Sequence, residues 1–184
     1  KCLNQRVRIV TSACMMSSSM NVEELDLTPL LTKYVNALRS VKDDKLRYQQ
    51  LLYLAAKCEG MPDTLKVEGN KVPGCLSTVH VHATLEDDKI MYQGDSDSQL
   101  TKGLVAMLVN GLTGCTADEI ERIQPEFIRY AGIGASLTPG RNNGFLNMLN
   151  VMKVKARQLT DGNHNNCSGS TQTKEAYQVQ GSPI

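Results

Sequence analysis

The chain has 184 residues, of which 41% are hydrophobic and 21% charged, and its formal net charge is +1. This length allows one globular domain with its own core, and the near-neutral charge gives no reason to expect nucleic acid or an anionic membrane as a partner. No apolar run reaches the roughly 18–20 residues of a membrane-spanning helix. We therefore expect neither nucleic acid nor a membrane among the partners.

The two ends of the chain differ in composition from its middle. Residues 1–24 begin with a basic stretch without acidic residues and continue with serine and methionine, a composition typical of an organelle transit peptide. Residues 161–184 are polar and cannot offset the entropy of ordering. We predict disordered segments at 1–24 and 161–184 and a folded domain at 25–160. The expected location is the plastid stroma, with the mitochondrion as second choice.

Two helices are predicted at the start of the domain. Thr28 and Pro29 supply an N-cap and a first helical residue ahead of an apolar stripe. Asp43 can cap a second helix, which Gly60 and Pro62 end. Both segments carry leucines at the spacing of one helix face, so both are expected to pack against a core.

The hydrophobic period then changes to that of strands. Residues 76–85 alternate between apolar and polar side chains and predict a first strand. Asp87 and Asp88 predict a turn, and residues 89–93 predict a short returning strand.

Three helix starts come after the strands. Asp97 or Ser98 begins a helix that runs to residue 110, and residues 116–119 form a capping box. Thr138 and Pro139 open the last helix. Helices followed by a small antiparallel sheet and further helices indicate the α+β class.

Six cysteines occur without a C-x-x-C pair, which excludes a zinc ribbon and a thioredoxin-type redox motif. A domain of this size does not require disulfides, so a reducing compartment is expected. Cys58 and Cys115 stand at predicted helix ends, where we expect them to be small buried hydrophobic residues.

Cys75 stands at a different kind of position. Pro73 and Gly74 suit the two central positions of a type II turn, which places Cys75 on a connection just before the first strand. The thiol is then either presented for chemistry or, alternatively, begins the strand and points into the core.

Arg141 is the third residue of the last helix, where a cation opposes the helix dipole. A residue that breaks a local rule in this way is a candidate for function, and a guanidinium near a cysteine would favour the reactive thiolate. The alternative is an arginine that simply reaches into solvent.

The sequence offers two possible metal sites and argues against both. Asp95 and Asp97 suggest a calcium loop, but an EF-hand needs a glutamate at its twelfth position, where Ala106 stands. His80 and His82 share one face of the first strand. If that strand begins at Cys75, the thiol lies on the opposite face from both histidines.

Three segments carry a family resemblance. In order and spacing, "NKVPGCLSTVHV", "QGDSDSQLTKGLVAML" and "LTPGRNNGFLNML" resemble the SufE/CsdE family of sulfur-acceptor proteins. The resemblance covers residues 28–160. It implies an α+β fold shared with iron–sulfur scaffold proteins, in which helices pack on one face of a three-stranded antiparallel sheet. A loop at one end of that sheet carries the acceptor cysteine.

The resemblance also implies the site and the partners. Cys75 is the implied persulfide acceptor, Asp95 matches the acid that positions the loop, and Arg141 matches an arginine that stabilises the thiolate or aids docking. The implied partner is a PLP-dependent cysteine desulfurase of the SufS/NifS type, and sulfur passes on to an iron–sulfur scaffold. No cofactor or metal of its own is expected. The chain departs from the bacterial pattern at Pro73 and His80, where glutamine and tryptophan are common.

Two other functions remain open on the sequence. An iron–sulfur scaffold would need about three cysteines, or cysteine with histidine and aspartate, at one site. A stand-alone cysteine hydrolase would need His80 or His82 hydrogen-bonded to Cys75.

Overall fold

The computed structural model describes residues 25–134 and 137–164. The predicted transit-peptide segment, residues 1–24, and most of the predicted polar tail lie outside these described residues. The elements, in chain order, are α1 (Pro29–Ser40), α2 (Asp44–Lys57), the short 3-10 helices η2 (Asp63–Leu65) and η3 (Glu68–Asn70), β1 (Val79–Glu86), β2 (Lys89–Ser96), α3 (Gln99–Leu112), α4 (Ala117–Arg122), α5 (Phe127–Tyr130) and α6 (Pro139–His164).

The predicted helix starts are confirmed, and the physical reasons are those that the sequence indicated. The Thr28 hydroxyl oxygen accepts the Leu31 amide at 3.2 Å, and the same hydroxyl donates to the Gly111 carbonyl at 2.6 Å, which ties α1 to the end of α3. Asp43 accepts the amide of Lys45 and caps α2. The capping box of Thr116 and Glu119 is formed at the start of α4.

The sheet is smaller than expected. Two strands, β1 and β2, pair antiparallel from Val79 opposite Ser96 to Glu86 opposite Lys89. The expected third strand is therefore wrong for the described residues: beside β1 it is reduced to a single bridge between Lys71 and His80. The pairing stops there because Pro73 has no N–H to donate and the chain turns away immediately after it.

The strand boundaries also differ from those predicted. The first strand begins at Val79 rather than at residue 76, and the second runs on to Ser96 rather than ending at residue 93. Asp87 and Asp88 form the predicted turn with positive φ angles of 48° and 61°.

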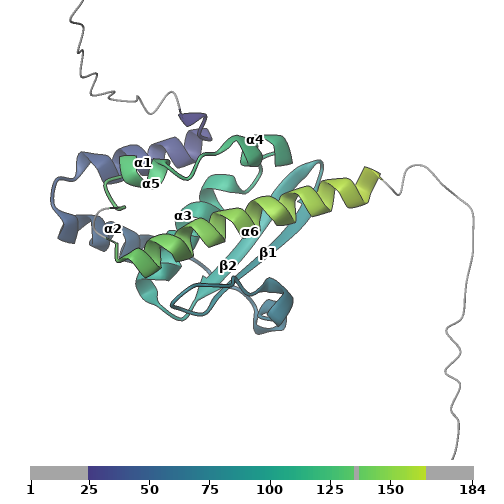
Figure 1. Ribbon diagram of the computed structural model, residues 1–184, viewed down its shortest axis with the longest axis horizontal. Coiled ribbons are helices and arrows are strands. Elements are labelled where there is room, and N and C mark those ends of the chain that lie inside the picture. Colours follow the sequence, from purple (N-terminus) through teal and green to yellow (C-terminus); the bar gives the residue numbers. More distant parts are fainter. Residues whose placement is uncertain (1–24, 135–136, 165–184) are drawn as a thin grey trace, which may run out of the picture.

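The helices cover the hairpin and close one core. α6 lies along β1 and α3 lies along β2, while α2 and α1 pack on the far side of α3 (Figure 1). Two contacts fix this arrangement: the Tyr92 hydroxyl donates to the Met152 carbonyl at 2.7 Å, and the rings of Phe127 and Phe145 meet edge to face at 5.5 Å. α6 continues to His164, past residue 160, where the predicted domain ends.

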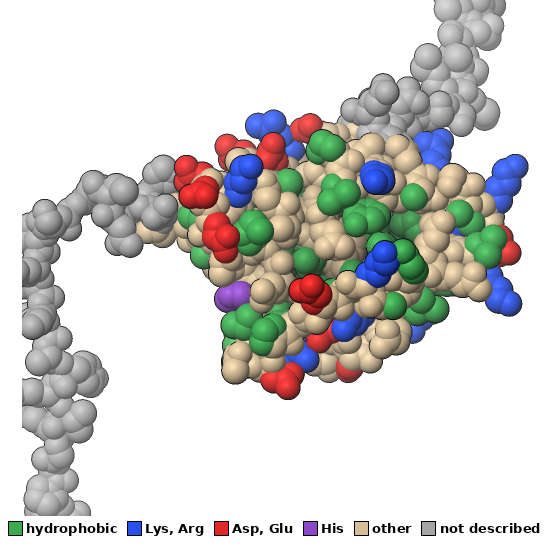
Figure 2. Space-filling model, turned by 180° about the vertical axis from the view of Figure 1, so that it is seen from behind, with side chains coloured by type: hydrophobic (Ala, Val, Ile, Leu, Met, Phe, Trp, Pro, Cys, Tyr) green, Lys and Arg blue, Asp and Glu red, His purple; other side chains and the backbone are tan. Residues whose placement is uncertain are grey.

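The surface carries both signs of charge. On the face seen from behind, acidic and basic side chains alternate with small groups of hydrophobic ones (Figure 2). None of the described helices is long and apolar enough to cross a membrane.

Candidate functional site

The loop before β1 places Cys75 outside regular secondary structure. Residues 73–78 bulge between Val72 and Val79, whose amide and carbonyl meet at 2.8 Å and close the base of the loop. Gly74 has a φ of 71°, a left-handed conformation that glycine adopts without steric cost. The predicted Pro73–Gly74 turn is thus formed, and Cys75 does not begin the strand.

The thiol of Cys75 rests on the backbone of α6. Its Sγ donates a weak hydrogen bond to the Gly144 carbonyl at 3.5 Å, and a Cβ added at Gly144 would lie 3.3 Å from that sulfur. Leu76, the next residue, is 76% exposed although it is apolar, and it leans on Gly140 one turn earlier in the helix. Glycines at both helix positions therefore let the loop approach the helix closely.

A small cavity of about 10 Å³ lies beside the sulfur. Its lining includes Cys75, Leu104, Arg141, Gly144 and Met148. A space of this size is about that of a single water-sized atom. The cavity therefore leaves room for one additional atom next to Cys75, in surroundings that are mainly apolar.

Side chains from α6, from α3 and from the segment between β2 and α3 hold the loop. Asn147 of α6 donates from Nδ2 to the Pro73 carbonyl at 3.0 Å. At the other end, the Thr78 amide donates to Asp97 Oδ1 at 3.1 Å, and the hydroxyls of Ser77 and Thr101 meet at 3.3 Å. Sequence reasoning missed Asn147 altogether and took Asp97 for a helix start. The available signal for Asn147 was its spacing of three from Gly144, which puts both on one helix face.

Burial raises the pKa of the Cys75 thiol. Arg141 lines the same cavity as the thiol, and its stabilisation of the thiolate stays a prediction. Arg141 stands at the third residue of α6, as predicted, and its guanidinium makes no hydrogen bond or ion pair with a described residue.

Asp95 lies at the same end of the hairpin as Cys75 but does not contact the loop. Its carboxylate pairs with Lys66 and Lys102, each at 3.0 Å. Burial works to raise the pKa of Asp95, but the hydrogen bonds from the two lysines and from the Ser96 amide outweigh it and lower that pKa to about 2. Lys102 is the neighbour of Thr101, whose hydroxyl meets that of Ser77, so α3 connects Asp95 to the loop.

The remaining candidates are not brought together. Cys58 and Cys115 stand at helix ends as predicted, but each is half-buried rather than buried. The His82 ring lies 3.4 Å from the Asn70 amide, and neither His82 nor His80 is bonded to Cys75. Within the described ranges, no three metal-binding side chains converge.

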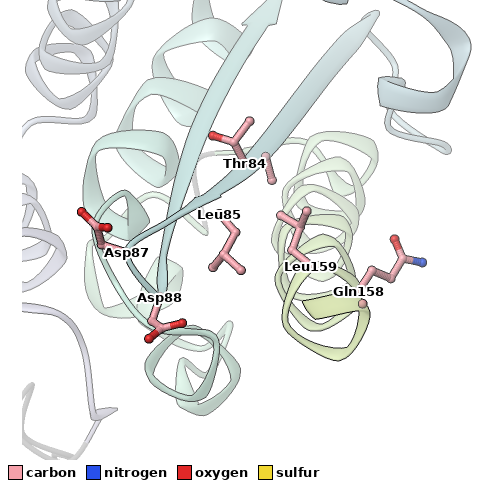
Figure 3. Close-up of a pocket in the computed structure, with 8 residues that line it drawn as sticks. Thr84, Leu85, Asp87, Asp88, Gln158 and Leu159 are labelled. Atoms are coloured by element: carbon pink, nitrogen blue, oxygen red, sulfur yellow. The ribbon is translucent and has the colours of Figure 1, made fainter. Parts of the chain in front are cut away.

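A second, wider cavity lies elsewhere. A space of about 630 Å³ opens between the end of β1 and the last turns of α6, where Leu85 and Leu159 point toward each other and Asp87 and Asp88 edge the opening (Figure 3). Its lining holds no cysteine. We assign the site to the small cavity at Cys75 because the reactive group is there.

The fold and site define a class: an α+β domain that carries a loop thiol against a glycine-lined helix. Comparison with known proteins identifies the class further. The model of the SufE family, described as an Fe-S metabolism associated domain, matches residues 32–156. The chain therefore belongs to the SufE family.

Relatives span several lineages. The chain is 50% identical over 130 residues to an uncharacterised SufE-like protein of Synechocystis, covering 71% of this chain and 82% of that protein. It is 41% identical to SufE-like protein 1, chloroplastic/mitochondrial, of Arabidopsis thaliana, over 79% of this chain and 40% of the relative. It is 44% identical to the cysteine desulfuration protein SufE of Plasmodium vivax, over 73% of this chain and 55% of that protein.

The chain thus spans about half the length of the plant and Plasmodium relatives, whereas it covers most of the cyanobacterial one. A solved structure supports the fold. The solution structure of a hypothetical protein from Thermus thermophilus matches 73% of this chain and 98% of its own, with a TM-score of 0.65 and 26% identity.

Proposed function

We propose that this chain is the sulfur acceptor of a PLP-dependent cysteine desulfurase, with Cys75 as the acceptor. The observation that carries the proposal is the placement of Cys75 on a loop outside regular structure, resting on Gly144 beside a one-atom cavity. The names of relatives agree with this role, since the Plasmodium vivax protein is a cysteine desulfuration protein and one from Escherichia coli is the sulfur acceptor protein CsdE.

The chemistry is an exchange between a thiolate and a persulfide. Cys75 loses its proton and attacks the outer sulfur of the persulfide on the desulfurase cysteine. A new S–S bond forms at Cys75, the S–S bond on the partner breaks, and the partner cysteine leaves as a thiolate that takes up a proton. Nothing is oxidised or reduced overall, so neither protein needs a further reactant in this step.

The resting geometry suits storage better than attack. Burial raises the pKa of Cys75, which lowers the fraction of thiolate while the loop lies on α6. The transfer step therefore takes place with the loop lifted into the partner, where Arg141 can stabilise the anion. After transfer, the cavity next to Cys75 shelters the outer sulfur from reductants until it passes to an iron–sulfur scaffold.

The alternatives have weaker support. A scaffold needs converging ligands, but the three described cysteines contact different parts of the fold: Cys58 the Gly94 carbonyl, Cys75 the Gly144 carbonyl and Cys115 the backbone of Ile90. A hydrolase needs a base beside the thiol, and the hydrogen bond that Cys75 makes goes to a carbonyl.

Three parallel treatments of the chain separate the three functions. The full chain is mixed with a cysteine desulfurase and cysteine without reductant, and peptides are examined by mass spectrometry. A gain of about 32 Da, the mass of one sulfur atom, on the Cys75 peptide supports the acceptor. An acyl adduct with an ester substrate supports the hydrolase. Visible absorbance after anaerobic reconstitution with iron and sulfide, without added mass on Cys75, supports the scaffold.

We further propose the plastid stroma as the location, with the mitochondrion second. The Arabidopsis relative is named chloroplastic/mitochondrial. A fluorescent fusion of the full-length precursor tests this in plant cells, and fluorescence that stays in the cytosol contradicts it.

A further inference from the structure

The tip of the Cys75 loop is held without backbone hydrogen bonds. The base of the loop is fixed by the Val72–Val79 bond, but no backbone N–H or C=O of Gly74, Cys75 or Leu76 is bonded to the backbone of a residue that the structure describes. A backbone without such partners has little directional restraint. The position of the thiol is therefore set by the side-chain contacts around it.

Those contacts are unequal. Leu76 leans on Gly140 through apolar atoms, and the Cys75 Sγ meets the Gly144 carbonyl at the long distance of 3.5 Å. Asn147, by contrast, donates a well-formed hydrogen bond of 3.0 Å to the Pro73 carbonyl. Its Nδ2 also lies 2.6 Å from where a Cβ at Gly74 would stand, so the amide lies directly over the turn.

The opposite end of the loop is anchored more firmly. Two hydrogen bonds join Thr78 to Asp97. The Thr78 amide donates to Asp97 Oδ1 at 3.1 Å, and the Asp97 amide donates to the Thr78 carbonyl at 3.2 Å. Releasing Asn147 therefore frees the turn that precedes Cys75 while the entrance to β1 stays in place. On that side the Asn147 bond is the shorter of the two hydrogen bonds that hold the loop on α6.

We propose that Asn147 is a positioning residue that latches the Pro73–Gly74 turn onto α6 and so keeps the Cys75 thiol in its half-buried position until a partner lifts the loop. The identity of that partner rests on the proposed function, but the latch itself does not. Opening also relieves the burial that raises the Cys75 pKa, so loss of the latch increases both the access and the thiolate fraction of the same sulfur.

The test is site-resolved alkylation of the full chain with iodoacetamide over a series of pH values. Asn147→Leu keeps the branched shape and neutrality of the side chain but adds some bulk and removes the donor. Cys75 should react about three- to tenfold faster, the range of one net hydrogen bond, and the midpoint of its pH profile should fall. Cys58 and Cys115, read in the same spectra, should not change. Asn150→Leu is the matched control, because Asn150 is exposed on the same helix.

Three outcomes would overturn the latch. One is an unchanged Cys75 rate in Asn147→Leu, and another is an equal acceleration of all three cysteines, which indicates general loss of stability. The third is acceleration in Asn147→Leu but not in Asn147→Ala, which assigns the effect to the bulk of leucine rather than to the lost bond.

A second arm links the latch to sulfur transfer. With a desulfurase present, Asn147→Leu should lower the concentration of this chain that gives half-maximal stimulation, while the maximal rate stays the same. If the unmodified chain itself gives no stimulation, the proposed function fails, whereas the alkylation result still decides the latch.

Discussion

The β1–β2 hairpin closes at one end through Asp87 and Asp88, and at its other end it adjoins the loop that carries Cys75. At the closed end the strands stay paired up to Glu86 and Lys89, so backbone hydrogen bonds hold the turn. At the open end the loop tip depends on side chains of α6 and α3. Both ends adjoin a cavity, but the larger of these two lies at the closed end and has no cysteine in its lining. Reactivity is found with the weakly held backbone and not with the larger cavity.

The strongest test of this difference is Cys75→Ser. Sulfur transfer and desulfurase stimulation should be lost completely, because a hydroxyl ionises far above neutral pH and cannot accept sulfur. The free energy of unfolding should change by no more than about 0.5 kcal/mol, since serine has nearly the same size and the site is half-buried. Desulfurase turnover and urea unfolding measure the two effects.

The other cysteines supply the control for that test. Cys58→Ala and Cys115→Ala should each cost about 1 kcal/mol of stability and leave transfer intact. Full stimulation by Cys75→Ser, or its loss in Cys58→Ala, would show that the loop thiol is not the acceptor.

Arg141→Ala should give a smaller loss, slowing transfer about tenfold through one missing charge-assisted contact. The variant should nevertheless be a few tenths of a kcal/mol more stable, because a cation in the first turn of α6 opposes the helix dipole. Single-turnover kinetics measure the slower transfer, and thermal unfolding measures the gain in stability. Arg141→Lys should restore part of the rate, and Arg39→Ala, at an exposed position on α1, should leave it unchanged. Equal rates in Arg141→Ala and the unmodified chain would remove Arg141 from the site.

Asp95→Asn tests the ion pairs with Lys66 and Lys102 at the open end of the hairpin. The folded-state pKa of Asp95 is lowered to about 2, so its stabilising contribution is present above the ordinary value near 3.8 and is lost as the pH falls from about 4 toward 2. The variant should lose about 1–2 kcal/mol at neutral pH, and the difference should vanish in acid. Urea unfolding over a pH series measures this.

The control for Asp95 is Asp63→Asn, which removes the other, almost fully exposed partner of Lys66 and should cost less than about 0.5 kcal/mol. If the two variants lose the same stability, the half-buried position of Asp95 has no special importance.

The smallest effect is expected at the closed end. Asp88→Gly should stabilise the fold by about 0.5 kcal/mol, because an Asp–Gly pair suits a two-residue turn in which both φ angles are positive. Gly74→Ala at the open end should do the reverse and cost about 1–2 kcal/mol, since its φ is also positive and Asn147 leaves no room for a Cβ. Thermal unfolding of both variants measures the contrast. A loss of stability in Asp88→Gly, or a gain in Gly74→Ala, would contradict the positive φ angles on which both predictions depend.

Local chemistry determined much of this protein at the level of sequence. The caps at Thr28, Asp43 and Thr116 and the turns at Gly74 and Asp87 depend on neighbouring residues alone, and all were predicted where they occur. The three family segments likewise identified the family from residues close in sequence.

Contacts between distant segments were decided only by the tertiary structure. Beside β1 the expected third strand is a single bridge, because the chain turns away soon after Lys71. Asp95 forms ion pairs with Lys66 and Lys102 rather than a bond to the loop. Asn147 reaches Pro73 across 74 positions of the chain, a contact that no periodicity encodes. Whether Cys75 is exposed or sheltered depends on that packing, because the energy of a half-buried thiol is set by the helix against which it rests.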